Sequence, residues 1–449
     1  MNNLETIFKA YDIRGKVGSE LNKDSVQAIG QAFGQWLPKP GIVAVGRDMR
    51  PDSSDLAQAI IAGLRASGHD VWDIGEVTSD MIYFVTGHYG LAGGAMITAS
   101  HNPGEYNGIK LCREEAMPIG EESGLFEIRD LVLDAKLKPV SKQGSLTEKD
   151  VCDDWISHIM SFVDVAKLKP LKIAVDAGNG MAGKIFPELE PHVPFEVEEL
   201  YFELDGSFPN HIANPLEPKN LVDLQAAIAK YGSDVGVAFD GDGDRAVLVD
   251  ETGVPLTGTV MTALLADYFL GKHPGATILH NAICGRAAIE AIKSAGGKPI
   301  RTRVGHSFIK SDMRKHNAVF GGEHSGHYYF KDNFMADSGL IAAIVALAVL
   351  SSSGKKLSEL VAPFRRAYLQ IPEANFEVAD KTKIMQKIAA SFSEGKQDWL
   401  DGLTVNFPDY WFNVRPSNTE PLLRLNAEAK TKNQLDVIVE RVSRLIDQS

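Results

Sequence analysis

Cysteine is scarce in this chain, and its three cysteines lie far apart. Cys112, Cys152 and Cys284 form no cluster with the spacing of a metal site, and their odd number argues against a disulfide framework. Long apolar runs are also missing, because the most apolar stretch, Leu340–Leu350, falls well short of the ~20 residues that span a bilayer. The opening MNNLETIFKAYDIRG has acidic and polar residues where a signal peptide is apolar. We therefore expect a cytoplasmic protein.

Positive charge is in the minority. The 449 residues include 46 Lys and Arg against 59 Asp and Glu, which gives a net charge of −13. An acidic protein binds nucleic acid and anionic membranes poorly, so an anionic ligand needs locally concentrated positive charge. Hydrophobic residues make up 44% and charged residues 23%, a globular balance that excludes disordered and fibrous classes.

Short apolar stretches alternate with amphipathic ones along most of the chain. Ile42–Val45 and Val71–Ile74 are predicted strands, and Leu56–Ala66 between them has helical spacing. Further strands are expected at Leu171–Asp176, Asp234–Phe239, Thr277–Leu279 and Pro299–Thr302, and further helices at Arg286–Ser294 and Ser307–His316. This alternation predicts βαβ units with mostly parallel sheets.

The last segment has a different pattern. Leu403–Phe407 and Trp411–Val414 alternate, and a terminal helix is predicted from Asn433 to Ile446, which favours an α+β fold with an antiparallel sheet. At ~150 residues per domain the length suggests three or four compact units. We divide the chain into three α/β domains at residues 1–145, 146–249 and 250–363, weakly similar to one another in sequence, and an α+β domain at 364–449.

Ser100 and His101 lie in the loop TASHNP, residues 98–103, after a strand-like apolar stretch. A Ser beside a His is typical of nucleophilic catalysis, but adjacent residues on an extended strand point to opposite faces and need not touch. The flanking glycines of a hydrolase nucleophile elbow are missing. An ordinary Asn-Pro turn with surface hydroxyls is the alternative.

Three carboxylates, Asp240, Asp242 and Asp244, alternate with two glycines and are followed by Arg245. Carboxylates this close repel one another unless a cation holds them, and their hard oxygen donors suit Mg²⁺. An EF-hand fits the acidic positions, with Glu251 as the last ligand, but Arg245 stands where that loop requires Gly. A solvated acidic turn is the other alternative.

The loop GGEHSGH, residues 321–327, lies between two strand-like stretches. Glu323 and Ser325 offer the donors and acceptors that suit sugar hydroxyls. His324 and His327 are three residues apart in a Gly-rich loop with no helix to hold them, which disfavours zinc. A polar hairpin is the alternative.

The loop RPSNTEP, residues 415–421, combines one guanidinium with hydroxyl and amide groups. Arg415 supplies a bidentate fork, and Ser417, Asn418 and Thr419 add neutral donors, so the loop suits a phosphate. A Pro-bounded turn is the alternative. Taken together, the four loops describe phosphoryl transfer on a sugar phosphate.

TASHNP, DGDGDR, GEHSGH and RPSNTEP, in this order, resemble the four signatures of the α-D-phosphohexomutase superfamily. The opening motif FKAYDIRG at residues 8–15 and the Gly305-His306-Ser307 turn are similar to that superfamily as well. Within it, the chain most resembles bacterial phosphomannomutases and phosphoglucomutases. The resemblance implies three related α/β domains and a smaller C-terminal one, arranged in a heart shape around a deep cleft.

The resemblance also implies a role for each matching residue. Ser100 would be the phosphoserine and would contact a Mg²⁺ ion held by Asp240, Asp242 and Asp244. Lys110 would be the general base, with a pKa lowered by nearby cations. Arg14 and Arg245 would line the transfer site, and His101 would assist there. The implied substrate-binding residues are His306, Glu323, Ser325, His327, Arg415, Ser417, Asn418 and Thr419.

The implied activity is that of a phosphomannomutase, with phosphoglucomutase activity as a second expectation. Phosphorylated Ser100 would interconvert hexose 1-phosphate and hexose 6-phosphate through a hexose 1,6-bisphosphate that turns over in the cleft, assisted by a mobile fourth domain. Mg²⁺ is the expected cofactor and hexose 1,6-bisphosphate the expected activator. The expected partners are small hexose phosphates, without nucleic acid or membrane, and the expected state is a monomer or homodimer.

Three alternatives stay open. A phosphoglucosamine mutase shares the chemistry, a phosphatase would release the phosphate, and a catalytically inactive protein would only bind sugar phosphates. One position departs from the family pattern: Ile283 stands in a strand-to-helix turn where relatives often carry a basic residue. Arg286 is a candidate substitute, and the preference between mannose and glucose stays open.

Overall fold

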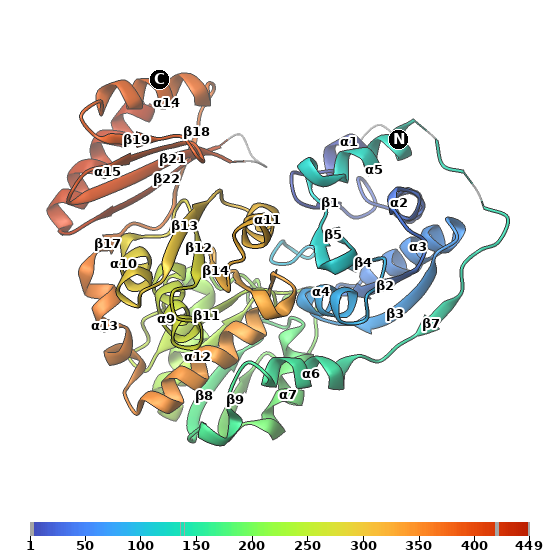
Figure 1. The fold of residues 1–449 in the computed structure, drawn as a ribbon, viewed down its shortest axis with the longest axis horizontal. Coiled ribbons are helices and arrows are strands. Elements are labelled where there is room, and N and C mark those ends of the chain that lie inside the picture. The colour runs from blue at the N-terminus through green and yellow to red at the C-terminus, as the bar shows by residue number, and fades with distance from the viewer. Residues whose placement is uncertain (1–3, 135, 139, 418–421, 448–449) are drawn as a thin grey trace. The chain divides into compact units, whose positions relative to one another are not determined.

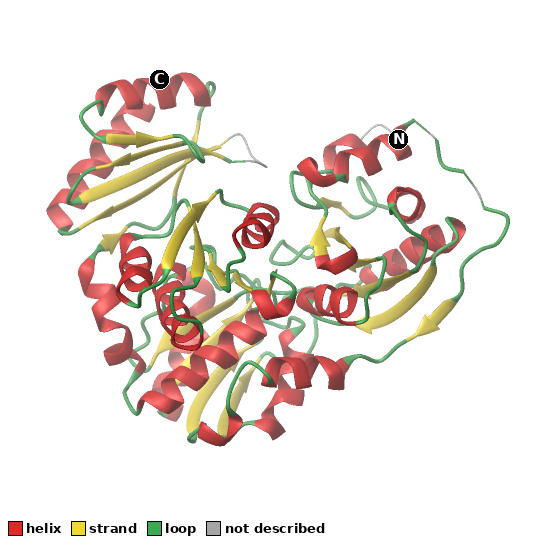
Figure 2. Cartoon of the chain, viewed as in Figure 1, coloured by secondary structure: helices red, strands yellow, loops and turns green. Residues whose placement is uncertain are grey.

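The structure, a computed structural model, describes residues 4–134, 136–138, 140–417 and 422–447. It divides into two compact units, one of Met1–Leu256 with Ser325–Ser358 and the other of Thr257–His324 with Glu359–Ser449. Both units are built from sheets covered by helices (Figures 1 and 2).

The first sheet has the strand order β1-β5-β4-β2-β3-β7, with β6 paired to β5. Its strands are β1 (Ile13–Lys16), β2 (Ile42–Arg47), β3 (Asp70–Glu76), β4 (Gly93–Ile97), β5 (Tyr106–Arg113), β6 (Met117–Pro118) and β7 (Leu146–Glu148). β2, β3, β4 and β7 are parallel, whereas β5 is antiparallel to its neighbours. The accompanying helices are α1 (Leu4–Ile7), α2 (Lys23–Trp36), α3 (Ser53–Ala66), α4 (Ser79–His88) and α5 (Leu125–Leu133).

The second sheet has the order β11-β10-β8-β9 and also belongs to the first unit. Its strands are β8 (Leu171–Asp176), β9 (Phe195–Leu200), β10 (Val235–Phe239) and β11 (Ala246–Asp250), with helices α6 (Cys152–Met160), α7 (Ala182–Leu189) and α8 (Val222–Tyr231). β10 and β11 form an antiparallel pair around the acidic loop. An EF-hand is therefore excluded, and the Glu251 carboxylate instead accepts hydrogen bonds from the Ser358 amide and hydroxyl.

The second unit contains three parallel strands in the order β13-β12-β14. They are β12 (Thr277–Asn281), β13 (Lys298–Thr302) and β14 (Phe320–Gly322). Its helices are α9 (Gly258–Lys272), α10 (Arg286–Ser294) and α11 (His306–His316). The following β15 (Tyr328–Phe330), β16 (Ala336–Asp337) and α12 (Gly339–Ser353) belong to the first unit. After them comes α13 (Leu357–Ala367).

The last sheet is antiparallel, as predicted, with the order β17-β22-β21-β20-β19 and β18 paired to β22. It consists of β17 (Leu369–Gln370), β18 (Ala374–Glu377), β19 (Lys396–Asp398), β20 (Leu403–Asn406), β21 (Tyr410–Pro416) and β22 (Leu422–Ala429), covered by α14 (Lys381–Ser391) and α15 (Lys432–Asp447). Apolar residues of both helices and of the central strands form one buried core. The predicted fold class, α/β segments followed by an α+β segment, is confirmed.

One strand arrangement recurs along the chain. The order β9-β8-β10-β11 repeats β3-β2-β4-β5, including the antiparallel fourth strand, and β13-β12-β14 repeats the first three positions. TASHNP follows β4, DGDGDR follows β10, and the EHSGH part of the third motif follows β14. Three of the four predicted loops therefore leave equivalent strands.

The structure bears on the expectations drawn from the few cysteines and from the short apolar runs. Cys112, Cys152 and Cys284, all among the described residues, form no disulfide. Within the described ranges, no single helix is long and apolar enough to cross a membrane, and α12 with α13 meets that test only as a pair bent by 107°. Almost all of α12 is buried.

Arg286 joins α10 to the last sheet inside the second unit. Its guanidinium donates to the carbonyl oxygens of Phe407, Pro408 and Tyr410, and its backbone amide donates to the Glu428 carboxylate. Three of the five N–H donors of the Arg286 guanidinium are therefore engaged at the turn between β20 and β21, and a sugar contact by Arg286 stays a prediction. Ile283 itself is buried, 4% exposed.

Replacing Arg286 by alanine should loosen this connection. Because three charge-assisted hydrogen bonds disappear, Arg286→Ala should lower the free energy of unfolding by about 2 kcal/mol, measured by denaturant titration. Lys293→Ala, at an exposed position of the same helix, is the control and should change little. Equal stability of the two variants would contradict this role for Arg286.

Candidate active site

Ser100 occupies a strained position between β4 and β5. Its φ of 50° is left-handed, and its side chain is buried at 3% residue exposure. The Ser100 amide donates to the Thr98 hydroxyl at 2.9 Å, which helps to hold this turn. Left-handed backbone is uncommon for residues other than glycine and asparagine, and it persists where the surroundings fix it, often at functional sites.

The Ser100 hydroxyl meets both a carboxylate and a histidine. Its Oγ donates to Asp240 Oδ2 at 2.7 Å and lies 3.1 Å from His101 Nδ1. The prediction that Ser100 and His101 need not touch assumed an extended strand; the left-handed turn brings them together. Arg245 Nη2 completes the group by donating to Ser100 Oγ at 3.3 Å and also contacts His101.

The carboxylates of Asp240, Asp242 and Asp244 lie close together, and that of Asp240 contacts the Ser100 hydroxyl. They are nearly inaccessible, and one carboxylate oxygen from each lies within 4.8 Å of the others. Among the described residues, Oδ1 of Asp242 and Oδ1 of Asp244 are buried without a hydrogen-bond partner. Three convergent carboxylates with unsatisfied oxygens fit a hard divalent cation such as Mg²⁺. Burial and the neighbouring Asp244 charge raise the pKa of Asp240 to about 8.

Lys110, from β5, neutralises part of this negative charge. Its Nζ lies 2.6 Å from Asp242 Oδ2 and 2.5 Å from Asp244 Oδ2. Burial acts to lower the pKa of Lys110, but these two carboxylates outweigh it and raise the pKa well above its ordinary value. The expected lowering by arginines is therefore not what the structure shows, because the nearest charges to Lys110 are carboxylates.

The remaining predicted cations and histidine surround the serine loop. Arg14, on β1, donates to Asp12 Oδ2 and to Asn102 Oδ1, each at 2.5 Å. Arg245 Nε donates to Asp240 Oδ2 at 2.9 Å. Burial and these two guanidiniums hold the pKa of His101 well below its ordinary value, so its ring is neutral near pH 7 and can accept a hydrogen bond.

The third motif divides between the two units. Ser325 Oγ lies 3.1 Å from His327 Nδ1, and His327 Nε2 lies 3.6 Å from Asp244 Oδ1, all within the first unit. In the second unit His324 Nδ1 lies 3.0 Å from Thr259 Oγ1. Among the described residues, His327 forms with Asp244 and Asp337 a group of three side chains that could hold a metal ion, and His324 belongs to no such group.

Glu323 directly follows β14 within the second unit and contacts the residue before α11. Its Oε1 accepts from the Gly305 amide at 3.1 Å and from Asn281 Nδ2 at 3.2 Å, and it is 2% exposed. The amide of Gly305 directly precedes His306, so the predicted sugar-binding residues Glu323 and His306 are neighbours. A carboxylate oriented in this way can accept hydrogen bonds from hydroxyl groups.

Arg415 is the penultimate residue of β21 and is oriented by an acidic residue that sequence reasoning missed. Glu373 accepts from Arg415 Nη2 at 3.0 Å, from Arg424 Nη1 at 3.1 Å and from Asn426 Nδ2 at 2.9 Å. Ser417 donates its amide to the Leu422 carbonyl at 2.8 Å. The predicted phosphate ligands Asn418 and Thr419 lie outside the described residues.

Two further residues of the serine site were missed. Ser79, the first residue of α4, donates its amide to the Asp242 carbonyl at 2.9 Å and its hydroxyl to Asp242 Oδ2 at 2.5 Å. Arg50 contacts the backbone of the serine loop. Neither carries a motif, because both act through tertiary contacts; the sequence signal for Arg50 is a charged Asp48-x-Arg50 pair just after an apolar strand.

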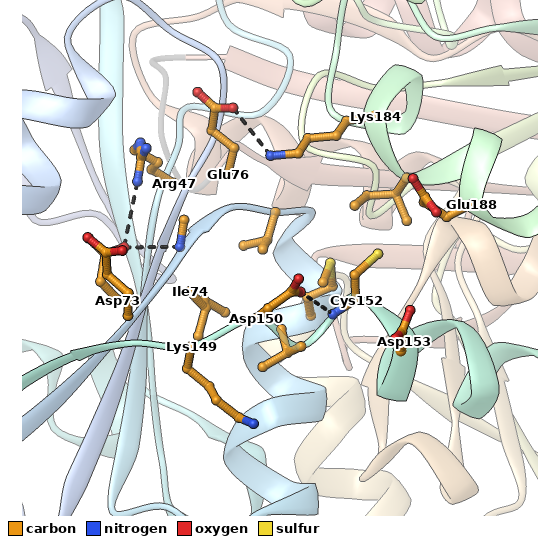
Figure 3. Close-up of a pocket in the computed structure, with 16 residues that line it drawn as sticks. Arg47, Asp73, Ile74, Glu76, Lys149, Asp150, Cys152, Asp153, Lys184 and Glu188 are labelled. Atoms are coloured by element: carbon orange, nitrogen blue, oxygen red, sulfur yellow. Dashed lines mark hydrogen bonds and ion pairs between the residues drawn. The ribbon is translucent and has the colours of Figure 1, made fainter.

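A cavity of 710 Å³ lies elsewhere in the first unit (Figure 3). Two ion pairs lie in its lining: Arg47 lies 3.6 Å from Asp73, and Lys184 lies 3.4 Å from Glu76. The lining holds more acidic than basic side chains and includes no predicted site residue of the described chain. This cavity therefore has the wrong charge for a sugar phosphate.

Comparison with known proteins defines the family. Models of the phosphoglucomutase/phosphomannomutase family match alpha/beta/alpha domain I at residues 5–138, domain II at 153–253, domain III at 257–368 and the C-terminal domain at 373–445. The chain belongs to the phosphoglucomutase/phosphomannomutase family. The predicted resemblance to phosphohexomutases is thereby confirmed.

Individual relatives cover nearly the whole length of this family member. Phosphohexose mutases of Xanthomonas campestris pv. campestris (strain ATCC 33913) are 44% identical, over 94% of this chain and 95% of theirs. The phosphomannomutase of Escherichia coli K12 is 40% identical, over 95% of both chains. A crystal structure of a phosphoglucomutase/phosphomannomutase family protein from Burkholderia thailandensis superposes with a TM-score of 0.91 at 33% identity, covering 99% of this chain and 97% of that one. The predicted enzyme class, a mutase and therefore an isomerase, is confirmed.

Removing the ammonium from this mutase's aspartate cluster should destabilise it. In EDTA, Lys110→Met should lower the free energy of unfolding by about 3–5 kcal/mol, because buried carboxylates lose their partner. Added Mg²⁺ should recover part of that loss, as followed by thermal unfolding. Lys136→Met, at an exposed ion pair with Asp134, is the control. A Lys110→Met variant as stable as this control would contradict the charge balance described here.

Proposed function

We propose that this mutase is a phosphomannomutase, with phosphoglucomutase activity as well, that works through a phosphorylated Ser100. The observation that carries the proposal is the buried contact of Ser100 Oγ with Asp240, inside a group that also contains Arg245. A nucleophilic oxygen placed between a carboxylate set and a guanidinium suits phosphoryl transfer, in which positioning and charge stabilisation supply most of the catalysis.

Asp240, Asp242, Asp244 and Ser100 would hold the Mg²⁺ ion. When bound, it would withdraw negative charge from the carboxylates and from the transferring phosphoryl group. The fit rests on the two orphaned carboxylate oxygens described above and on the oxygen-rich donor set.

The first transfer breaks the bond between the phosphorus and Ser100 Oγ and forms one to the free hydroxyl oxygen of a hexose monophosphate. Lys110, once the charge of Asp242 and Asp244 is reduced, would take the proton of that hydroxyl, and the proton would end on Ser100 Oγ, which leaves the phosphorus and becomes a hydroxyl again. Arg14 and Arg245 would stabilise the charge on the moving group, and neutral His101 would hold Ser100 Oγ. The hexose 1,6-bisphosphate then turns over, and the reverse transfer returns its other phosphate to Ser100.

The other motifs would bind the parts of the substrate that do not react. Glu323 and Ser325 would bind sugar hydroxyls, with His306 and His327 beside them. Arg415, Ser417, Asn418 and Thr419 would bind the phosphate that is not transferred, with Glu373 orienting Arg415. We assign these roles to domains bounded at residues 1–145, 146–249, 250–363 and 364–449.

The preference for mannose rests on relatives named phosphomannomutase, among them those of Escherichia coli K12 and Vibrio cholerae. Coupled assays with mannose 1-phosphate, glucose 1-phosphate and glucosamine 1-phosphate test it. The highest kcat/KM is expected for mannose 1-phosphate. A preference for glucosamine 1-phosphate would instead make the protein a phosphoglucosamine mutase, and release of free phosphate without isomer would make it a phosphatase.

Replacing the nucleophile should abolish turnover without unfolding the chain. Ser100→Ala should lower kcat by about 10⁴-fold or more while its thermal unfolding stays near that of the parent protein. Ser161→Ala, an exposed serine of the same unit, is the control. Turnover by Ser100→Ala at the rate of this control would reject Ser100 as the phosphoryl carrier.

Removing divalent metal should stop the reaction reversibly. EDTA should abolish isomer formation and added Mg²⁺ should restore it, and Asp242→Asn should weaken Mg²⁺ binding about 10–100-fold in calorimetry. Asp73→Asn, a carboxylate away from the cluster, is the matched control. Activity that persists in EDTA would argue against the metal role.

A further inference from the structure

Arg50 lies just beyond β2 and is one of the most completely bonded side chains of the first unit. Residue exposure is 3%, and its Nε donates to Asp48 Oδ2 at 3.2 Å. Nη1 donates to the carbonyls of Pro103 at 2.8 Å and Tyr106 at 2.9 Å. Nη2 donates to the carbonyls of Ser100 at 2.9 Å and Asn102 at 2.6 Å. All five N–H donors of the guanidinium are therefore engaged.

Four of these five bonds reach the backbone of a single loop. Ser100, Asn102, Pro103 and Tyr106 direct their carbonyl oxygens at one point, an arrangement that needs a cation there because the carbonyl dipoles repel one another. The left-handed φ of Ser100 lies within the same turn. Arg50 thus offsets the cost of a backbone conformation that the loop does not favour by itself.

Arg50 is bound by a buried hydrogen-bond network of Asp48, Ser53 and Asn107. Asp48 accepts from the Arg50 amide at 3.0 Å and from Ser53 Oγ at 2.5 Å. Ser53 Oγ in turn accepts from Asn107 Nδ2 at 2.9 Å, next to the end of the same loop. The network therefore connects the start of α3, the end of β2 and both ends of the serine loop.

Residues between β9 and α8 pack against Arg50 as well. The Phe208 ring lies 5.2 Å from the Arg50 guanidinium carbon, and Phe208 has a left-handed φ of 54°. A Cβ on Gly206 would lie 2.5 Å from Arg50 Cα, and a Cβ on Gly241, in the metal loop, would lie 2.5 Å from the Ser100 carbonyl oxygen. The Ser100 carbonyl is thus confined between Arg50 and the aspartate loop.

We propose that Arg50 is a positioning residue of the phosphoryl transfer: it fixes the backbone of the serine loop so that Ser100 Oγ stays directed at Asp240. This inference rests on the proposed function of Ser100. Arg50 touches no reacting atom; its effect passes through the loop carbonyls. A phosphate on Ser100 would add a charge of about −1.5 to −2 beside the aspartate cluster, which makes a fixed loop backbone more important.

Lysine does not substitute for this guanidinium. An ammonium has three donors around a point, so it reaches at most some of the four carbonyls and leaves Asp48 with a weaker partner. A misplacement of the nucleophile by about 1 Å costs on the order of 10²-fold in rate. Arg50→Lys should therefore lower kcat about 100-fold while KM changes little.

The test compares Arg50→Lys with Arg47→Lys. Arg47 lies three residues before Arg50 on the same segment, and its guanidinium pairs with Asp73 (Figure 3). Steady-state kcat and KM for the preferred hexose 1-phosphate are measured with Mg²⁺ and hexose 1,6-bisphosphate, and folding is followed by circular dichroism. In the folded Arg50→Lys variant, kcat should fall about 100-fold. Arg47→Lys should keep the parent kcat.

A second variant guards against misfolding. Arg50→Ala removes the side chain, and millimolar guanidinium ion, added as its chloride, should restore at least a tenth of the parent kcat by binding where the side chain was. Guanidinium should not activate Arg47→Ala.

Three results would overturn the proposal. The first is an unchanged kcat in Arg50→Lys, and the second is an equal loss of kcat in Arg47→Lys. The third is a loss of kcat in the Arg50 variants that matches their unfolded fraction, without rescue of Arg50→Ala by guanidinium. A parent protein that isomerises no hexose phosphate would instead overturn the proposed function, so the two failures are distinguishable.

Discussion

The contact between Ser100 Oγ and Asp240 is the constraint on which the rest of the first unit depends. A hydroxyl within 2.7 Å of a buried carboxylate is held there by elements that are distant in sequence. Lys110 from β5, Ser79 from α4 and Arg245 from the acidic loop each bind at least one aspartate of this cluster. Because three carboxylates are buried together, each of these donors is needed to keep the group stable.

The repeated strand order explains how the chain builds such a site. Each α/β repeat presents the loop that follows its third strand, so one structural position carries Ser100 in the first repeat and the three aspartates in the second. Arg50 and the close approach at Gly206 and Gly241 then hold these two loops in register. The recurring strand order thus places different sets of polar side chains at equivalent positions of the repeats.

Much of this could be predicted from the sequence, because loop motifs and strand patterns are local. The strands at Ile42–Val45 and Leu171–Asp176, the antiparallel last sheet and the convergence of Asp240, Asp242 and Asp244 follow the predictions.

What the sequence did not predict depends mostly on long-range contacts. Asp242 and Asp244 raise the pKa of Lys110, and Arg286 binds carbonyls more than 100 residues away. The contact between Ser100 and His101 depends instead on a local left-handed turn. Arg50 and Glu373 carry no motif, because their partners become neighbours only after folding.

Mass spectrometry of the Ser100 peptide tests the central claim most directly. The protein is incubated with hexose 1,6-bisphosphate and Mg²⁺, digested, and analysed for sites of phosphorylation. The account predicts a single phosphoryl group on Ser100, which disappears when excess hexose monophosphate is added. An active enzyme with its phosphate on another residue, or with none at any stage of turnover, would contradict it.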